Sequence, residues 1–114
     1  MSSVRTVNLE LGRPDADSAV RRLTYELHTA KTLGLAAFKV IHGYGSSGTG
    51  GRIRVEARAY LVRQKAKGVI RSFIPGEEFS IFNEDTRAAF ARCGELRQDA
   101  DLERHNNGVT IIVL

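Results

Sequence analysis

Apolar and polar residues follow two different periods along the first part of the chain. Residues 4–11 alternate between the two classes, which is the pattern of a half-buried strand. Residues 16–33 carry apolar side chains three and four positions apart, as an amphipathic helix does. Its apolar positions are Ala16, Ala19, Val20, Leu23, Leu27 and Ala30. Asp15 or Asp17 suits the N-cap of this helix, and Gly34 suits the position after its last turn.

Further apolar runs continue the alternation of strand and helix. Short runs at residues 35–41, 69–74 and 109–114 are typical of buried strands. Residues 52–67 show helical spacing again. The positions that this helix would bury are Ile53, Ala57, Tyr60, Leu61 and Gln64. We therefore expect a strand–helix–strand–helix–strand order, followed later by one more strand.

An acidic segment at residues 77–105 separates the last two strands. Asn83 and the two acids after it resemble a helix cap, and Gly94 closes a predicted helix over residues 86–93. The apolar residues that the segment 77–105 could bury in a core are Phe79, Ile81, Phe82, Phe90, Leu96 and Leu102. The acids Asp99, Asp101 and Glu103 are typical of a solvated face. The segment is interpreted as an ordered helical insertion.

These elements predict an α/β fold in the order β-α-β-α-β-(helical insert)-β. Strands that alternate with helices favour parallel pairing, because a helix returns the chain to the same end of the sheet. Four strands predict a two-layer α/β sandwich with a mixed sheet, whose last strand runs antiparallel to its neighbours. Residues 1–114 are expected to form one domain, with the insertion at about 77–105.

Composition and charge narrow the class of protein. The chain has 114 residues, 42% hydrophobic and 26% charged, as in ordinary globular proteins. No run has the length of a membrane span, the first residues lack the apolar stretch of a signal peptide, and Cys93 is the single cysteine. These features favour a cytoplasmic protein that does not contact a membrane.

Positive charge is concentrated in the first two thirds of the chain. Residues 1–75 hold 13 Lys and Arg against five Asp and Glu, a net charge of +8, whereas residues 76–114 hold four against eight, a net charge of −4. A strongly basic part suits a polyanionic partner, above all nucleic acid, although it also serves solubility.

A glycine-rich loop joins the strand at 35–41 to the helix at 52–67. Such a loop lets the backbone approach a ligand and presents amides at the positive end of the helix dipole, which suits a phosphate. The predicted phosphate-binding residues are His42, Gly43, Tyr44, Gly45, Ser46, Ser47, Gly48, Thr49, Gly50, Gly51, Arg52 and Arg54. Cations at a helix start oppose the dipole, so a bound anion would explain Arg52 and Arg54.

Other phosphate and metal motifs fit less well. Residues 43–48 match the dinucleotide pattern G-x-G-x-x-G. That pattern also requires an acid at the end of the next strand, and the strand at 69–74 has none there. Gly45 and Gly50 have P-loop spacing, but the Lys-Ser/Thr pair is missing. The histidines and the cysteine lack metal-ligand spacing, so no metal site is expected.

His42 has two possible roles. It could pack beneath the loop as a structural residue, or it could face a phosphate and donate a hydrogen bond or move a proton. Its position next to Gly43 favours the second role.

Three segments together resemble the Smr (small MutS-related) domain family: residues 42–45, which read His-Gly-Tyr-Gly, the helix start at 50–54, and the final strand at 108–111. The resemblance covers residues 7–74 and 106–114, and the segment 77–105 is longer than the usual loop. It implies a nucleic-acid-binding domain, in some members a nicking endonuclease or ribonuclease, with a fold similar to the C-terminal domain of bacterial translation initiation factor three.

The chain departs from the family at the end of the first strand. There the family usually has Leu-Asp-x-His, whose Asp and His are implicated in cleavage, whereas this chain reads Leu9-Glu10-Leu11-Gly12. Glu10 keeps a carboxylate, but Gly12 replaces the histidine, so the resemblance implies binding more strongly than cleavage.

Three functional hypotheses follow. The first is a domain that binds DNA or RNA through the glycine-rich loop and the basic helix. The second is an active endonuclease in which His42 acts as acid or base and Glu10 positions water or a divalent cation. The third is a module that binds a phosphorylated small molecule in the loop or a protein partner on the acidic insertion. No cofactor is expected beyond the cation of the second hypothesis.

Overall fold

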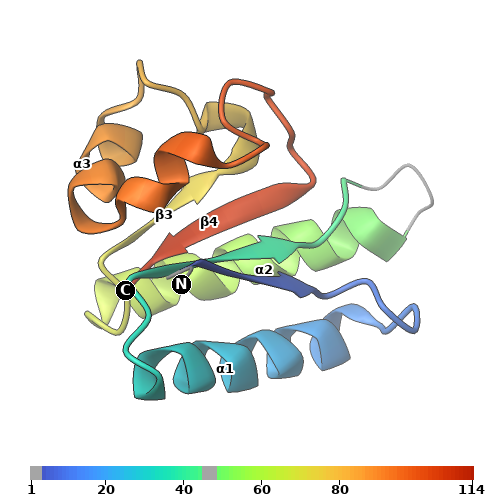
Figure 1. The fold of residues 1–114 in the computed structure, drawn as a ribbon. Coiled ribbons are helices and arrows are strands. Elements are labelled where there is room, and N and C mark those ends of the chain that lie inside the picture. Colours follow the sequence, from blue (N-terminus) through green and yellow to red (C-terminus); the bar gives the residue numbers. More distant parts are fainter. Residues whose placement is uncertain (1–3, 45–48) are drawn as a thin grey trace.

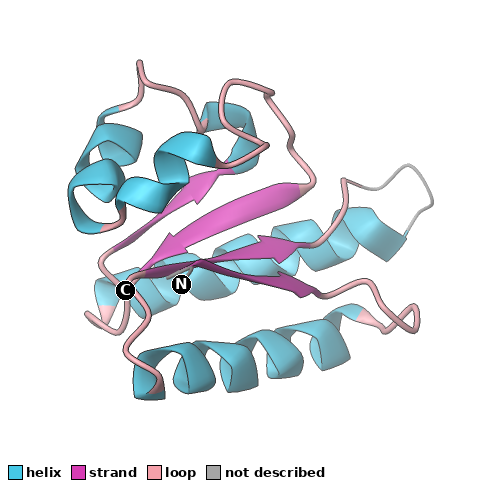
Figure 2. Cartoon of the chain, viewed as in Figure 1, coloured by secondary structure: helices cyan, strands magenta, loops and turns pink. Residues whose placement is uncertain are grey.

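The computed structural model describes residues 4–44 and 49–114, in which strands and helices alternate (Figures 1 and 2). The strands are β1 (Val4–Asn8), β2 (Ala37–Ile41), β3 (Ser72–Pro75) and β4 (Val109–Val113). The α-helices are α1 (Ala16–Thr32), α2 (Thr49–Ala66) and α3 (Glu84–Arg92). Two short 3-10 helices, η1 (Gly76–Glu78) and η2 (Gly94–Gln98), flank α3. The predicted α/β class is confirmed.

The four strands form one mixed sheet in the order β1-β2-β4-β3. β1 and β2 are parallel, with Val7 opposite Val40. β4 lies between β2 and β3 and is antiparallel to both, with Ile111 opposite Lys39 on one side and Ile74 on the other. The predicted antiparallel direction of the last strand is confirmed.

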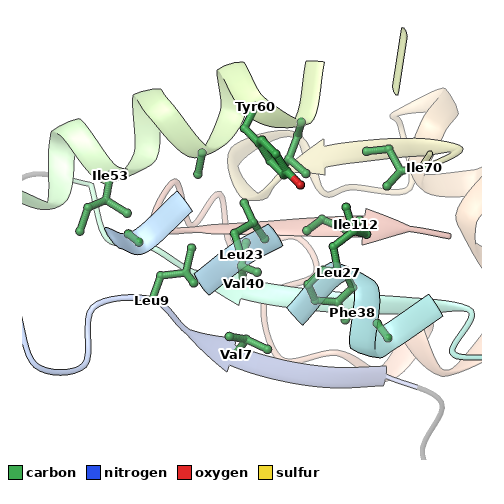
Figure 3. Close-up of a cluster of buried hydrophobic side chains, with 14 residues drawn as sticks. Val7, Leu9, Leu23, Leu27, Phe38, Val40, Ile53, Tyr60, Ile70 and Ile112 are labelled. Atoms are coloured by element: carbon green, nitrogen blue, oxygen red, sulfur yellow. The ribbon is translucent and has the colours of Figure 1, made fainter. Parts of the chain in front are cut away.

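Helices α1 and α2 cover one face of the sheet (Figure 1). Alternate strand residues point into this layer and meet the apolar stripes of the two helices, as periods of two and 3.6 residues require. Figure 3 shows the resulting core. Its labelled members are Val7, Leu9, Leu23, Leu27, Phe38, Val40, Ile53, Tyr60, Ile70 and Ile112. This half of the molecule follows the sequence prediction.

The opposite face is covered by the segment between β3 and β4, so the fold has three layers and the two-layer prediction is wrong (Figure 1). The apolar side chains of this second core are Ala37, Ile74, Phe79, Ala89, Phe90, Cys93, Leu96, Ile111 and Val113. All five residues of β4 are buried, because each face of this strand packs against a different layer. Two predicted core residues of the insertion lie outside: Ile81 is 49% exposed and Phe82 is 85% exposed.

A buried ion cluster joins this third layer to the sheet. Lys39 of β2 points toward the insertion, and its Nζ lies 3.0 Å from Asp99 Oδ1 and 2.7 Å from Asp101 Oδ2. Burial lowers the pKa of Lys39, but the two carboxylates outweigh it, so its pKa lies above the usual value. Asp99 and Asp101 were predicted to lie on a solvated face, and the structure instead pairs them with Lys39.

Several element boundaries differ from the predictions. β1 ends at Asn8 rather than at residue 11, and α2 begins at Thr49 rather than at residue 52. β3 begins at Ser72, because Val69 still belongs to the end of α2: its amide donates to Gln64, and Gly68 before it has a φ of +75°. Within the described chain, no helix is both long and apolar enough to cross a membrane.

Candidate functional site

The carboxyl ends of β1 and β2 meet at one edge of the sheet, because these two strands are parallel. Glu10 lies just beyond β1, and His42, Gly43 and Tyr44 lie just beyond β2. Helix α2 starts at the same edge (Figure 1). Ligands of α/β proteins commonly bind at this end of parallel strands. The structure therefore brings Glu10 and the described ends of the predicted loop to one side of the molecule.

Part of the predicted loop is not described. The predicted binding residues outside the described part of the chain are Gly45, Ser46, Ser47 and Gly48. Thr49 and Gly50 are the first residues of α2. The described part of the candidate site therefore consists of residues on either side of this gap.

His42 is fully buried beneath the start of the loop. Its Nδ1 lies 2.8 Å from the carbonyl oxygen of Gly43, and its Nε2 lies 2.8 Å from Thr110 Oγ1. Because a carbonyl oxygen only accepts, Nδ1 carries the proton and the Thr110 hydroxyl donates to Nε2. Burial lowers the pKa of His42 to about 4, and the nearby Arg58 acts in the same direction. His42 is therefore neutral near pH 7, and both of its ring nitrogens are occupied within the protein.

Arg58 of α2 extends this chain of hydrogen bonds to the insertion. Its Nε donates to Thr110 Oγ1 over 3.3 Å, and its terminal nitrogens donate to the Glu77 carboxylate over 2.8 and 2.7 Å. Burial raises the pKa of Glu77, but the hydrogen bonds from Arg58 outweigh it, so its pKa lies below the usual value. The network fixes α2, β4 and the insertion to one another. Sequence reasoning missed it, because its members are far apart along the chain.

The first backbone amides after β2 are occupied as well. The amides of His42 and Gly43 both donate to the carbonyl oxygen of Gly108, over 2.9 and 3.0 Å. Gly43 has a φ of +74°, and a Cβ added there would overlap the Glu10 carboxylate. Glycine is therefore required at position 43 for its conformation and for the close approach of Glu10. The prediction that the Gly43 amide is free to hold a phosphate is wrong in this conformation.

Glu10 and His42 do not form an acid–base pair. The Glu10 carboxylate lies against Gly43, whereas the ring of His42 is bonded to Gly43 and Thr110. No hydrogen bond between Glu10 and His42 is found in the described part of the chain. Among residues 4–44 and 49–114, no group of three His, Cys, Asp or Glu side chains could hold a metal ion.

The start of α2 differs from the starts of the other two α-helices. The side chain of Asp15 caps α1, and that of Asn83 caps α3. Gly48, which precedes α2, has no side chain that could do so, and the first turn of α2 holds no acid. The first four amides, counted from the residue before a helix, have no acceptor within it, and Gly51 is the last of these in α2. Among the described residues, none outside α2 accepts a hydrogen bond from the amide of Gly51. This amide can therefore receive an anion.

Arg52 and Arg54 lie on different sides of α2, because two helical positions are about 200° apart around the axis. Arg52 is exposed and lines a hollow of about 290 Å³ together with Asp15 and Asp17 at the start of α1. Arg54 is half-buried and close enough to Glu77 to help lower the pKa of that carboxyl group. The two cations flank the start of α2 rather than converge on one point.

Tyr44 lies at the same edge of the sheet, just beyond β2. It is 55% exposed, and one edge of its ring lies next to Gly108. This position is compatible with packing of the loop and with stacking on a base.

Comparison with protein-family models, with curated proteins and with solved structures gives no match in any of the three. The likeness to the Smr domain therefore rests on the sequence motifs around His42, at the start of α2 and in β4.

Proposed function

We propose that the chain is a nucleic-acid-binding domain, similar to a stand-alone Smr domain, in which the start of α2 holds a backbone phosphate. The observation that carries this proposal is the amide of Gly51, the third residue of α2, which has no acceptor outside the helix among the described residues. A helix start with a free amide attracts an anion. The exposed side chain of Arg52 adds positive charge near this point, which Asp15 and Asp17 in the same hollow offset in part. The phosphates of DNA and RNA supply the same chemistry.

The distribution of charge supports a polyanion. Residues 1–75 carry a net charge of +8, and α2 contains a single acid, Glu56. Arg58 is bound to Glu77 and so contributes little to the free positive surface. Tyr44 offers an exposed aromatic ring near the same edge, and stacking on a base contributes about 1–3 kcal/mol.

The proposal is limited to binding. An endonuclease that uses His42 needs a ring nitrogen within reach of its substrate, and both nitrogens of His42 are engaged with Gly43 and Thr110. Glu10 keeps a carboxylate at this edge, but it has no hydrogen bond to that imidazole in the described structure. Cleavage by this pair would require a rearrangement that opens the buried network.

A phosphorylated small molecule is the weaker alternative. Pockets for such ligands usually have volumes of about 300–1,000 Å³. The hollow beside Arg52 has a volume of about 290 Å³ and carries the carboxylates of Asp15 and Asp17, which repel an anion. The acidic insertion offers a different possibility, because Phe82 is 85% exposed next to Ile81 and would suit an apolar pocket on a protein partner.

A salt titration of oligonucleotide binding tests the proposal. We expect binding to weaken steeply with salt, and the slope of log K against log[salt] to fall by about 1.5 in the variant Arg52→Ala plus Arg54→Ala, because each phosphate contact contributes about 0.7–0.9. The matched control, Arg97→Ala plus Arg104→Ala, removes the same charge from the insertion and should leave the slope unchanged. A flat titration, or equal slopes in both variants, would reject the proposal.

A further inference from the structure

A second group of cations lies at the opposite end of α2 from the glycine-rich loop. Lys31, Lys65, Arg71 and Arg92 line a groove of about 560 Å³, and all four residues are exposed. They come from the last turns of the three α-helices and from the chain just before β3. The groove contains no Asp or Glu side chain in its lining.

Helix dipoles explain only part of this charge. The end of a helix carries about −0.5 of an elementary charge, so three helix ends supply about −1.5 against the four cations. A positive excess of about 2.5 elementary charges remains, and a terminal carboxylate on Leu114 would reduce this excess to about 1.5. Arg71 does not belong to a helix, so the dipole argument does not apply to it.

The cations also lack acidic partners in the described structure. No carboxylate of a described residue lies within 4 Å of any of them; the Nζ of Lys31 donates to the carbonyl oxygen of Val69 over 2.9 Å. Asp85 lies in the adjoining hollow beside Arg71 and Arg92 without forming an ion pair with either. Cations whose charge is only partly balanced repel one another, and a bound anion would relieve this repulsion.

Helix α2 links the groove to the site at its start (Figure 1). Its 18 residues span about 27 Å at 1.5 Å per residue. A nucleic-acid strand that rises about 3.4 Å per nucleotide covers this length with about eight nucleotides. Between the two ends, the exposed residues of α2 are Val55, Glu56, Ala59, Val62 and Arg63.

We propose that the groove of Lys31, Lys65, Arg71 and Arg92 is a second phosphate-binding site, which holds the same nucleic-acid strand that the start of α2 holds. This inference rests on the proposed function and adds a direction and a length to it. The strand runs along α2, and a strand shorter than the helix reaches one site at a time. Occupying both sites at once raises the affinity without any new kind of contact.

The test compares single-stranded oligonucleotides of about 4 and about 16 nucleotides, which lie on either side of the eight-nucleotide span. For the unaltered chain we expect the longer probe to bind at least about tenfold tighter per available site. The variant Lys65→Ala plus Arg71→Ala should lose this advantage and still bind the short probe. The control pair Arg97→Ala plus Arg104→Ala should keep the advantage.

Amide NMR shifts give a second readout, which does not depend on the variants. The long probe should shift the amides of Gly68 and Arg71, and the short probe at equal saturation should shift them less than the amide of Gly51. Two results would overturn this inference and leave the proposed function standing. In the first, the affinity gain of the long probe is the same for the unaltered chain and for the variant Lys65→Ala plus Arg71→Ala. In the second, the amides of Gly68 and Arg71 do not shift. If neither probe binds the unaltered chain, both proposals fail.

Discussion

The buried imidazole of His42 makes the stability of the protein depend on pH in a defined direction. Its pKa falls from 6.5 in the unfolded chain to about 4 in the folded protein, because burial disfavours the charged ring. Between these values the unfolded chain binds more protons than the folded one, so acid favours unfolding. The stabilisation by the neutral ring is present in full above pH 6.5 and is lost as the pH falls toward 4.

The two pKa values give the size of this effect. Integration between about pH 7 and about pH 5 predicts a loss of about 2 kcal/mol from the free energy of unfolding. Most of this interval lies above the range in which the carboxylates titrate, since the usual pKa values of Asp and Glu are 3.8 and 4.5. The change over this interval therefore reports mainly on histidine.

Urea unfolding at the two pH values measures the effect. The variant His42→Gln should be less stable than the unaltered chain near pH 7 and should lose most of the pH dependence. The control His28→Gln changes an exposed histidine and should keep the pH dependence of the free energy of unfolding. If the unaltered chain were equally stable at both pH values, or if His42→Gln kept the full difference, the assignment of His42 as a buried neutral residue would be wrong.

Three further substitutions test the contacts around the sheet. Thr110→Val removes the hydroxyl between a buried imidazole and a guanidinium, and should cost about 1–3 kcal/mol in urea unfolding; a cost near zero would contradict the network. Gly43→Ala should lower the thermal midpoint by the equivalent of about 1–2 kcal/mol because of its positive φ, whereas Gly94→Ala, which has open space around it, should not; equal midpoints would contradict the assigned conformation. Lys39→Met leaves two carboxylates without their cation and should lower the free energy of unfolding by about 3 kcal/mol. The control Lys67→Met changes an exposed lysine and should alter it by less than about 0.5 kcal/mol. Similar costs would show that the ion cluster contributes little.

Local signals in the sequence predicted α1 and α3 and their ends well, whereas the start of α2 was missed by three residues. Asp15 caps α1 through the amide of Ser18, and Gly34 follows its last turn with a φ of +71°. Asn83 caps α3 through the amide of Thr86. Each of these features depends on residues three or four positions apart, so that spacing alone reveals them.

The third layer depends on contacts between distant residues and was missed. One signal for it was present: residues 109–114 form a nearly continuous apolar run, which is typical of a strand buried on both faces. A strand that is apolar on both faces needs a cover on each face, and the insertion supplies the second cover. The pairing of Lys39 with Asp99 and Asp101, across 60 and 62 residues, has no comparable local signal.

The candidate site divides in the same way. The glycine-rich loop, its position after β2 and the cations of α2 are visible in the sequence. The burial of His42 is not, because its partner Thr110 lies 68 residues away. Arg58 looks like one more surface cation until the fold places Glu77 opposite its guanidinium group.

The most direct test of the proposed phosphate site is an amide NMR titration of the unaltered chain with an oligonucleotide at low salt. We predict that the amide of Gly51, the third residue of α2, shifts strongly and saturates with the bound fraction. The amides of Ser18 and Thr86, at the same position in α1 and α3 and already bonded to their caps, should move little. Binding that left Gly51 unshifted, or that shifted all three helix starts equally, would contradict the claim that α2 holds the phosphate.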